Sequence, residues 1–402
     1  MPIFIKSALP ACHFYVISLS FFFQALTLGQ VYRFFAYVNL LIVLIFALSY
    51  FKPTALKPVL HKMPALVFGS LMLLIWLFVT EWGVTAHFPY DIKEIRHVIL
   101  AIGLMLGIAV IALNHDCQQT KIKPTLLAMV YLYTLSQLVA IYLLDRPYGT
   151  TKNPHYLAIY SAIFLVVSTF LALKTQHYIN RILLVACSII LGALLVYTSS
   201  RPTWIGLILA VMLVILCLRR KSALILAALS CLLFAVLLLV NAENFKSRWE
   251  DLLLHLGTEE RVTIWQDTWQ MQKSSNALQW AFGHGVEAFQ RDFPKHSRYY
   301  AQEKIDFNSP HNVVLELLYL YGVTGLLLVL AGLGWLYKAV LSIYFKTREN
   351  FTNGWIYLLL LMVLTIDVFT VGITLPFFVS INLNIIALVM GVTTYLNKLR
   401  NQ

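Results

Sequence analysis

Long apolar stretches dominate this 402-residue sequence and limit what it can fold into. Apolar residues make up 60% of the chain and charged residues only 12%, which a water-soluble domain could not bury. A helix needs about 20 mostly apolar residues to cross a membrane. Stretches of about this length lie at 12–29, 34–51, 64–81, 97–114, 125–144, 155–173, 182–198, 203–218, 222–241, 312–336, 354–373 and 376–396. The sequence therefore predicts an all-α integral membrane protein with about twelve transmembrane helices.

The lysines and arginines predict the orientation of these helices. Loops on the cytoplasmic side of a membrane carry an excess of Lys and Arg. With the N-terminus inside, most of these residues fall in inner loops, and the short outer loops hold only Arg33, Lys93, Arg96, Arg146, Lys152 and Arg201. Both termini are therefore expected in the cytoplasm. The net charge of +12 reflects this bias, so we expect no nucleic-acid partner.

One polar segment interrupts the apolar pattern between the ninth and the tenth stretch. This outer segment, 242–310, carries charges of both signs and is predicted to lie on the side opposite the cytoplasm. It divides the chain into 1–241 with nine transmembrane helices, the outer segment, and 311–402 with three more. A loop of this length is expected to contain secondary structure of its own.

The outer segment contains one predicted amphipathic helix. Thr258 is a suitable N-cap for it, and Val262, Trp265, Trp269 and Gln272 follow at a spacing that places them on one face. Because Trp residues favour the headgroup region, we expect this helix on the membrane surface or against the bundle.

His311 is the first candidate for chemistry. It lies directly after the outer segment, at the start of an apolar helix, and Asn312 follows it. Histidine can take or give a proton near neutral pH, so a histidine at this boundary is a candidate catalytic base. A structural histidine, which caps the helix or bonds to a loop carbonyl, is the alternative.

Three arginines on the outer side are candidates for phosphate binding. Arg201 lies in a very short turn between two apolar stretches, and its planar guanidinium suits bidentate contact with phosphate. It could equally reach toward lipid headgroups. Arg261 either binds phosphate or pairs with Glu259 or Glu260. Arg146 lies in a turn-rich loop that either contacts a sugar or phosphate or only connects two helices.

The other ionisable residues favour an enzyme over a transporter. Glu316 and Asp367 are the acidic residues well inside apolar stretches, and both lie toward outer ends. Proton-coupled carriers usually keep such groups at mid-membrane depth. His284, His296 and His311 lack the i, i+4 pairing of a helical metal site, and no Asp-x-Asp cluster offers oxygen ligands. We therefore expect no metal and no other cofactor.

Several motifs together resemble the O-antigen ligase and polymerase superfamily. His311-Asn312 is followed after nine residues by Gly322-x-x-Gly325, two glycines that also permit close helix contact. The outer segment is similar to that family in Arg261-x-x-x-Trp265, Gly283-x-Gly285 and Pro310-His311-Asn312, and the Ser200-Arg201 turn and the Gly149…Asn153-Pro154 loop fit it too. The likeness covers about 195–330 in detail and the twelve-helix layout in outline.

The resemblance implies a GT-C-like glycosyltransferase of the bacterial inner membrane whose active site faces the periplasm. Its donor would be a glycan on undecaprenyl diphosphate, and its acceptor lipid A-core if the chain is a ligase, which its length favours. An O-antigen polymerase or a protein O-oligosaccharyltransferase is the alternative within the family, and a lipid or glycan transporter is the alternative class.

The chemistry of such a transfer suggests roles for the candidate residues. Arg201 and Arg261 would bind the diphosphate and stabilise its growing charge without a metal. Asn312 and Arg146 would make further substrate contacts. His311 would take the proton of the acceptor hydroxyl, and direct displacement would invert the anomeric carbon.

Overall fold

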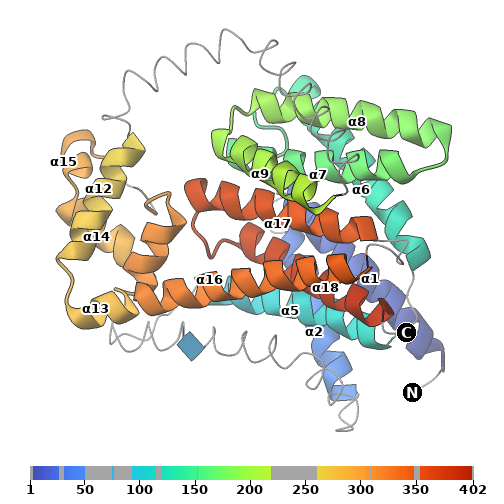
Figure 1. The fold of residues 1–402 in the computed structure, drawn as a ribbon, viewed down its shortest axis with the longest axis horizontal. Coiled ribbons are helices and arrows are strands. Elements are labelled where there is room, and N and C mark those ends of the chain that lie inside the picture. Colours follow the sequence, from blue (N-terminus) through green and yellow to red (C-terminus); the bar gives the residue numbers. More distant parts are fainter. Residues whose placement is uncertain are drawn as a thin grey trace.

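The residues that the structure describes fold into helices, and no β-strand occurs among them (Figure 1). This structure is a computed structural model. It describes residues 3–26, 31–49, 75–76, 93–114, 119–151, 153–218, 260–305, 307, 309–347 and 354–400. The predicted all-α fold is therefore confirmed over these ranges.

The predicted apolar stretches that fall within these ranges coincide with helices. The helices are α1 (Ile3–Leu26), α2 (Val31–Ser49), α5 (Lys93–Asn114), α6 (Gln119–Leu138), the π-helix η1 (Val139–Leu143), α7 (Pro154–Lys174), α8 (Tyr178–Tyr197), α9 (Arg201–Cys217), α12 (Glu260–Lys273), α13 (Ala277–Phe282), α14 (Ala288–His296), α15 (Arg298–Glu303), α16 (Val313–Thr347), α17 (Gly354–Thr374) and α18 (Ser380–Arg400). The predicted span at 222–241, and 64–81 apart from 75–76, lie outside the described residues. The number of twelve spans stays a prediction.

Five helices of the described part are long and apolar enough to cross a membrane. They are Lys123–Leu143, Pro154–Lys174, Tyr178–Tyr197, Val313–Lys346 and Trp355–Thr374. Large apolar side chains remain exposed along α8, for example Ile182 and Ile189. Such an exposed apolar face suits contact with lipid and would be unusual on a water-soluble protein. The structure thus agrees with an integral membrane protein.

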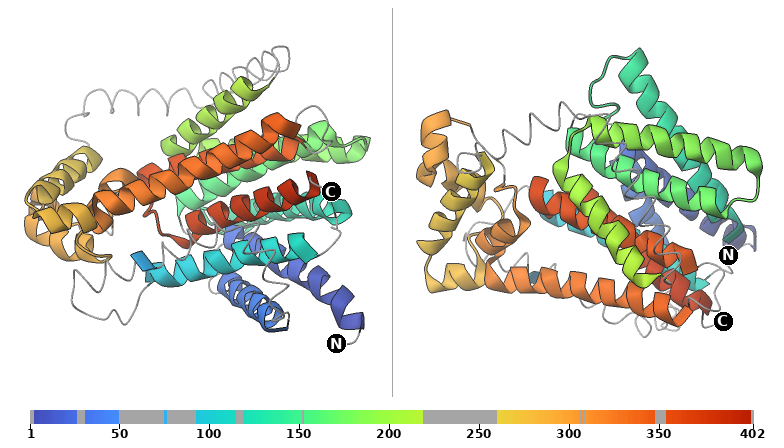
Figure 2. Two further views of the ribbon diagram at one scale, coloured as in Figure 1. Left: turned by 60° about the horizontal axis from the view of Figure 1, so that its bottom comes forward. Right: turned by 45° about the horizontal axis from the view of Figure 1, so that its top comes forward.

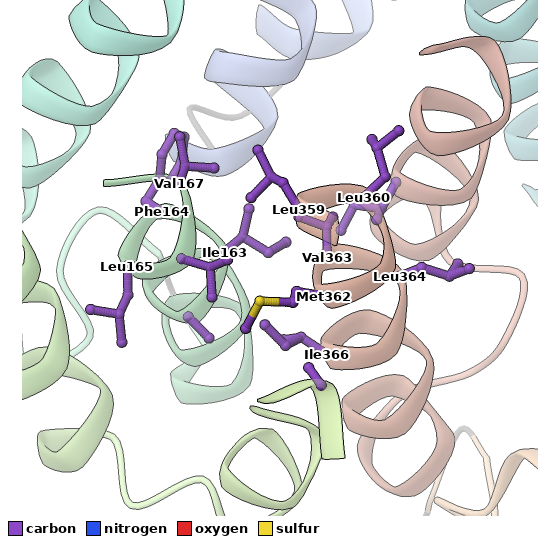
Figure 3. Close-up of a cluster of buried hydrophobic side chains, with 14 of the residues drawn as sticks. Ile163, Phe164, Leu165, Val167, Leu359, Leu360, Met362, Val363, Leu364 and Ile366 are labelled. Carbon is purple, nitrogen blue, oxygen red and sulfur yellow. The ribbon is translucent and has the colours of Figure 1, made fainter. Parts of the chain in front are cut away.

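The core of the bundle lies between α7 and α17. Both helices are buried on most sides, and α17 also packs against α9, α16 and α18. Ile163 of α7 and Met362, Val363 and Ile366 of α17 belong to one buried apolar cluster (Figure 3). A helix that is apolar all round is expected in such an interior position. On the other side, α18 packs on α5, and α5 contacts α2.

The described part of the outer segment forms a small helical group, α12 to α15, at one end of the bundle (Figures 1 and 2). The first turns of α16 lead from this group into the membrane-spanning part. Contacts of α12, α13 and α14 with α16 fix the group to the bundle.

The helix α16 is broken at Gly322, where α13 crosses it. Gly322 adopts a φ of 69° and a ψ of −176°, which is not helical. A Cβ atom there would clash with the carbonyl of Ala281, and one on Gly283 would clash with the carbonyl of Leu320. The hydroxyl of Thr324 donates to the Ala281 carbonyl at 2.9 Å. The close contact predicted for Gly322 is thus confirmed, but it accompanies a break in the backbone that the sequence interpretation missed.

The buried face of α12 differs from the face that the sequence predicted. Ile264, Thr268, Met271 and Gln272 are buried, whereas Trp269 is exposed to 38%. Val262 and Trp265 are half-buried. Of the predicted face, Gln272 is thus buried, and the face that packs inward is rotated toward Ile264 and Met271 and is partly polar.

Asp267 explains why a polar face is buried. Its carboxylate accepts hydrogen bonds from the Ser297 hydroxyl (2.8 Å), the Arg298 guanidinium (2.9 Å) and the Tyr299 backbone N–H (3.1 Å). Burial alone would raise the pKa of Asp267, but these donors outweigh it and hold the pKa below its usual range. The carboxylate therefore stays ionised and fastens α12 to the start of α15.

Candidate active site

His311 is held between the outer segment and the bundle. Its Nδ1 lies 2.9 Å from the backbone carbonyl of Thr374 at the end of α17. A carbonyl can only accept, so Nδ1 carries the proton in the neutral ring, and Nε2 is the unprotonated nitrogen. The ring also meets Phe307 edge to face at 5.7 Å, and the backbone is left-handed with a φ of 52°. This geometry leaves Nε2 as the basic nitrogen.

Asn312 caps the helix that follows. Its side-chain oxygen accepts from the backbone N–H groups of Val314 (3.1 Å) and Leu315 (3.2 Å), as an N-cap residue does. This capping role orients the His311 backbone relative to α16. The sequence interpretation proposed only a substrate contact for Asn312 and missed its capping role.

The helix α12 is tied directly to the His311 segment. The indole N–H of Trp265 donates to the Pro310 carbonyl at 2.9 Å. Arg261 precedes Trp265 by four residues, so both lie on the same side of α12. Arg261 is half-buried. The predicted pair of Arg261 and His311 is thus brought into one region by α12.

His155 is a residue of this region that the sequence analysis did not select. It interacts electrostatically with both Arg261 and His311. It lies at the start of α7, where Asn153 accepts from the His155 backbone N–H at 2.8 Å. Its Nδ1 is 3.1 Å from the Ser200 hydroxyl oxygen. An available signal was the Asn-Pro-His sequence at a helix start on the predicted outer side.

Arg201 begins α9, directly after Ser200. Pro202 follows at a position that suits a helix start, and Ser199 is left-handed with a φ of 53°. Arg201 is exposed, and its side chain has no hydrogen bond or ion pair within the described part of the chain. The contact of Ser200 with His155 places the start of α9 beside the region that contains His311.

No side-chain hydrogen bond or ion pair among the described residues joins Arg146 to this region. It is exposed in the loop that precedes α7. Gln137 holds that loop through hydrogen bonds to the Thr150 hydroxyl (2.7 Å) and from the Thr150 N–H (3.0 Å), and Gly149 is left-handed with a φ of 60°. The loop is fixed at the end of the bundle where α7 begins, but the predicted substrate contact of Arg146 stays a prediction.

Glu316 has a visible structural role. Its carboxylate accepts from the backbone N–H of Phe377 at 3.0 Å, which ties α16 to the loop between α17 and α18. In the same loop, the Phe378 carbonyl lies 3.2 Å from Nδ1 of His97 on α5. These bonds hold the loop that follows Thr374, the residue that orients His311.

These residues form a candidate site for an anionic substrate. A basic imidazole nitrogen, a half-buried arginine and a second histidine meet at one end of a helical membrane bundle, where they can handle an anionic substrate anchored in lipid. Residues 186–330 match the family model described as O-antigen ligase. This match supports the O-antigen ligase superfamily, which the motifs of the chain resemble. The match includes Arg201, Arg261 and His311 and begins after His155. Comparison with curated proteins gives no significant match.

Proposed function

We propose that this protein is an O-antigen ligase of the bacterial inner membrane. It transfers O-antigen polysaccharide from undecaprenyl diphosphate to a sugar of lipid A-core at the periplasmic face, with both termini in the cytoplasm. The observation that carries this proposal is the hydrogen bond from His311 to the Thr374 carbonyl, because it makes Nε2 the basic nitrogen in the region to which α12 brings Arg261. The O-antigen ligase match supplies the substrate class.

The proposed reaction forms one glycosidic bond and breaks one bond between the anomeric carbon and the diphosphate. A hydroxyl of the acceptor sugar attacks the anomeric carbon of the donor glycan, and Nε2 of His311 takes the hydroxyl proton. The bond between the anomeric carbon and the diphosphate oxygen breaks, and undecaprenyl diphosphate leaves with the electron pair. A positioned base contributes about 10²–10⁴-fold to such a step. Direct displacement inverts the configuration of the anomeric carbon.

The arginines neutralise the leaving group. Charge on the diphosphate grows as the bond breaks, and fixed cations aimed at it lower the barrier. Arg261 approaches from the outer segment and Arg201 from the start of α9, and Arg146 and Asn312 make further substrate contacts. In this proposal the guanidinium groups do the work for which other glycosyltransferases use a divalent metal. Transfer should then survive EDTA, and loss with EDTA followed by recovery with magnesium would refute this part.

The deciding experiment is a lipopolysaccharide gel from a host that lacks this protein, complemented with wild type, His311→Ala or His296→Ala. His296 is an exposed histidine of the same outer segment and serves as the control. We expect full O-antigen ladders with wild type and His296→Ala. With His311→Ala we expect bare core, with the glycan retained on its lipid carrier.

Other results would select the alternatives. Core that bears a single repeat unit would indicate a polymerase, and an intact ladder with unglycosylated target proteins would indicate a protein O-oligosaccharyltransferase. A lipid or glycan transporter would lose function through residues of the opposite membrane face and not through His311. An unchanged ladder in the deleted host would refute the whole proposal.

A further inference from the structure

Two histidines meet in the candidate site, and their hydrogen bonds assign them opposite tautomers. We propose that His155 is a neutral hydrogen-bond donor, through Nε2–H, to a diphosphate oxygen of the donor substrate. This inference rests on the proposed function and adds a donor-binding residue to it. It concerns a residue that lies outside the matched segment 186–330.

Thr203 sets the tautomer of His155, and its hydroxyl is completely buried. Its single hydrogen-bond partner among the described residues is the Ser200 hydroxyl, 3.0 Å away. A buried hydroxyl proton without an acceptor is costly, so the Thr203 hydroxyl is expected to donate to Ser200. The Ser200 oxygen then acts as the acceptor of this bond and keeps its own proton for another partner.

That other partner is His155. The Ser200 hydroxyl, which is itself buried, lies 3.1 Å from Nδ1 of His155. Because Ser200 accepts from Thr203, its proton points to Nδ1, which must then be the unprotonated nitrogen. The proton of the neutral ring therefore sits on Nε2. His311 has the reverse arrangement, since its Nδ1 donates to the Thr374 carbonyl.

The position of His155 suits an anionic ligand. It is the second residue of α7, and its bond to Ser200 joins the N-terminus of α7 to that of α9. Helix N-termini carry partial positive charge and favour anions. His155 also interacts electrostatically with Arg261, and Arg201 is the first residue of α9. The imidazole thus lies where two helix N-termini meet, within electrostatic reach of Arg261.

A donor at this point fits a diphosphate oxygen better than it fits the acceptor hydroxyl. Nε2–H of His155 can give a proton into a hydrogen bond but cannot take one, so it cannot replace His311 as base. Within the described residues Nε2 of His155 has no hydrogen-bond partner, and the imidazole is partly exposed. A hydrogen bond to a charged oxygen is stronger than one to a neutral hydroxyl.

Two substitutions of His155 test the roles of its two ring nitrogens separately. In His155→Gln the side-chain amide reaches the position of Nε2 and keeps a donor there. In His155→Asn the shorter amide reaches only the position of Nδ1, so the contact with Ser200 survives and the outer donor is lost. Thr203→Val keeps the shape of Thr203 but removes the hydroxyl that sets the tautomer. If His155 had a purely structural role, His155→Asn would not be expected to weaken donor binding more than His155→Gln.

The experiment measures binding and catalysis separately, with the purified full-length protein in lipid nanodiscs. The binding probe is undecaprenyl diphosphate alone, and transfer is measured with glycan-loaded donor and lipid A-core. We expect His155→Asn to raise the Kd of the probe and the donor KM by about tenfold or more. His155→Gln should stay within about threefold of wild type, and Thr203→Val should fall between them. The acceptor KM should not change.

Three results would overturn the assignment. Wild-type probe affinity in His155→Asn would remove the hydrogen bond. Equal losses in the Asn and Gln variants at unchanged thermal stability would indicate a structural histidine. A raised acceptor KM with an unchanged donor KM would move His155 to the acceptor side. Wild-type protein that binds the probe but transfers no glycan would refute the proposed function and leave the His155 result standing.

Discussion

The membrane bundle and the outer segment are held together by different forces. In the bundle, α7 and α17 meet through apolar side chains such as Ile163 and Met362 (Figure 3). In the outer segment, α12 is fastened by the buried carboxylate of Asp267, and the turn after α13 by His284, whose Nδ1 donates to the Tyr319 carbonyl at 2.9 Å. Apolar packing tolerates small shifts, whereas buried hydrogen bonds fix a geometry.

This difference matters because the candidate site takes residues from both regions. Arg261 belongs to the outer segment, while His155, Arg201 and the carbonyl of Thr374 belong to helices of the bundle. His311 lies at the boundary. Catalytic geometry must be held closely, so polar fixation of the outer segment is expected to matter as much for activity as the arginines themselves.

The largest expected effect comes from removing one arginine on each side of this boundary. Arg201→Ala and Arg261→Ala should each lower glycan transfer by about 10²–10³-fold, the usual cost of losing one preorganised charge or donor in an active site. Membrane insertion should stay normal. In the purified protein, Lys295→Ala serves as the control, because Lys295 is an exposed cation of the same segment. Full activity in either arginine variant would remove that residue from the site.

The next effect tests the junction of the two regions, with two glycines of the same helix. Gly322→Ala places a side chain in a left-handed backbone conformation and against the Ala281 carbonyl. It should destabilise the protein by about 1–3 kcal/mol or more and abolish transfer. Gly332→Ala meets no atom within 4 Å and should be neutral. Thermal unfolding in detergent and the lipopolysaccharide gel report both effects, and similar behaviour of the two variants would contradict this account of the kink.

Much of the bundle could be predicted from the sequence, because a helix in lipid must be apolar over its whole length. Arg261 and His311 could be selected as candidate site residues from their position beside the membrane and from motifs. The boundaries of α7 and α17 agree with the predicted spans to within a residue or so. The length and apolar character of a stretch thus predict a membrane helix well.

The polar contacts could not be predicted in this way. The partner of His311 is a backbone carbonyl 63 residues further along the chain, and that of His155 is a hydroxyl 45 residues away. Such pairs have no repeating pattern. For the same reason the sequence alone would suggest that Asp267 is a solvated charge on α12, although its three hydrogen-bond donors hold it in the interior. The break at Gly322 depends on α13, which crosses there.

A smaller effect is expected from the carboxylate that fastens α12. Asp267→Asn removes its charge and exchanges one acceptor for a donor that faces Arg298 or the Tyr299 N–H. The outer segment should lose about 2 kcal/mol of stability, and transfer should fall with it because Arg261 lies on the same helix. Limited proteolysis of the purified protein would detect the loosened segment. Unchanged protection and full transfer would show that apolar contacts alone hold α12.

The carboxylate of Asp267 also predicts that the folded protein loses stability at low pH. The pKa of Asp267 is below its usual range in the folded protein because the donors outweigh burial, so its contribution is complete above the unfolded pKa of about 3.9. It is lost as the pH falls through the folded value. Asp267→Asn should flatten this part of the acid unfolding curve, and an identical curve would contradict the assigned role.

The smallest effect is expected from His284 at mildly acidic pH. Burial lowers the pKa of His284 in spite of its hydrogen bond to Tyr319 and the nearby Asp292. The unfolded chain therefore binds a proton more readily, and stability falls as the pH drops below the unfolded value of about 6.5. Amide hydrogen exchange of α13, corrected for intrinsic rates, should speed up between pH 7 and pH 5 in wild type and in His296→Ala. His284→Gln should lack this change. Equal pH dependence in all three proteins would show that the junction of α13 and α16 depends on Gly283 and Gly322 alone, and not on the imidazole.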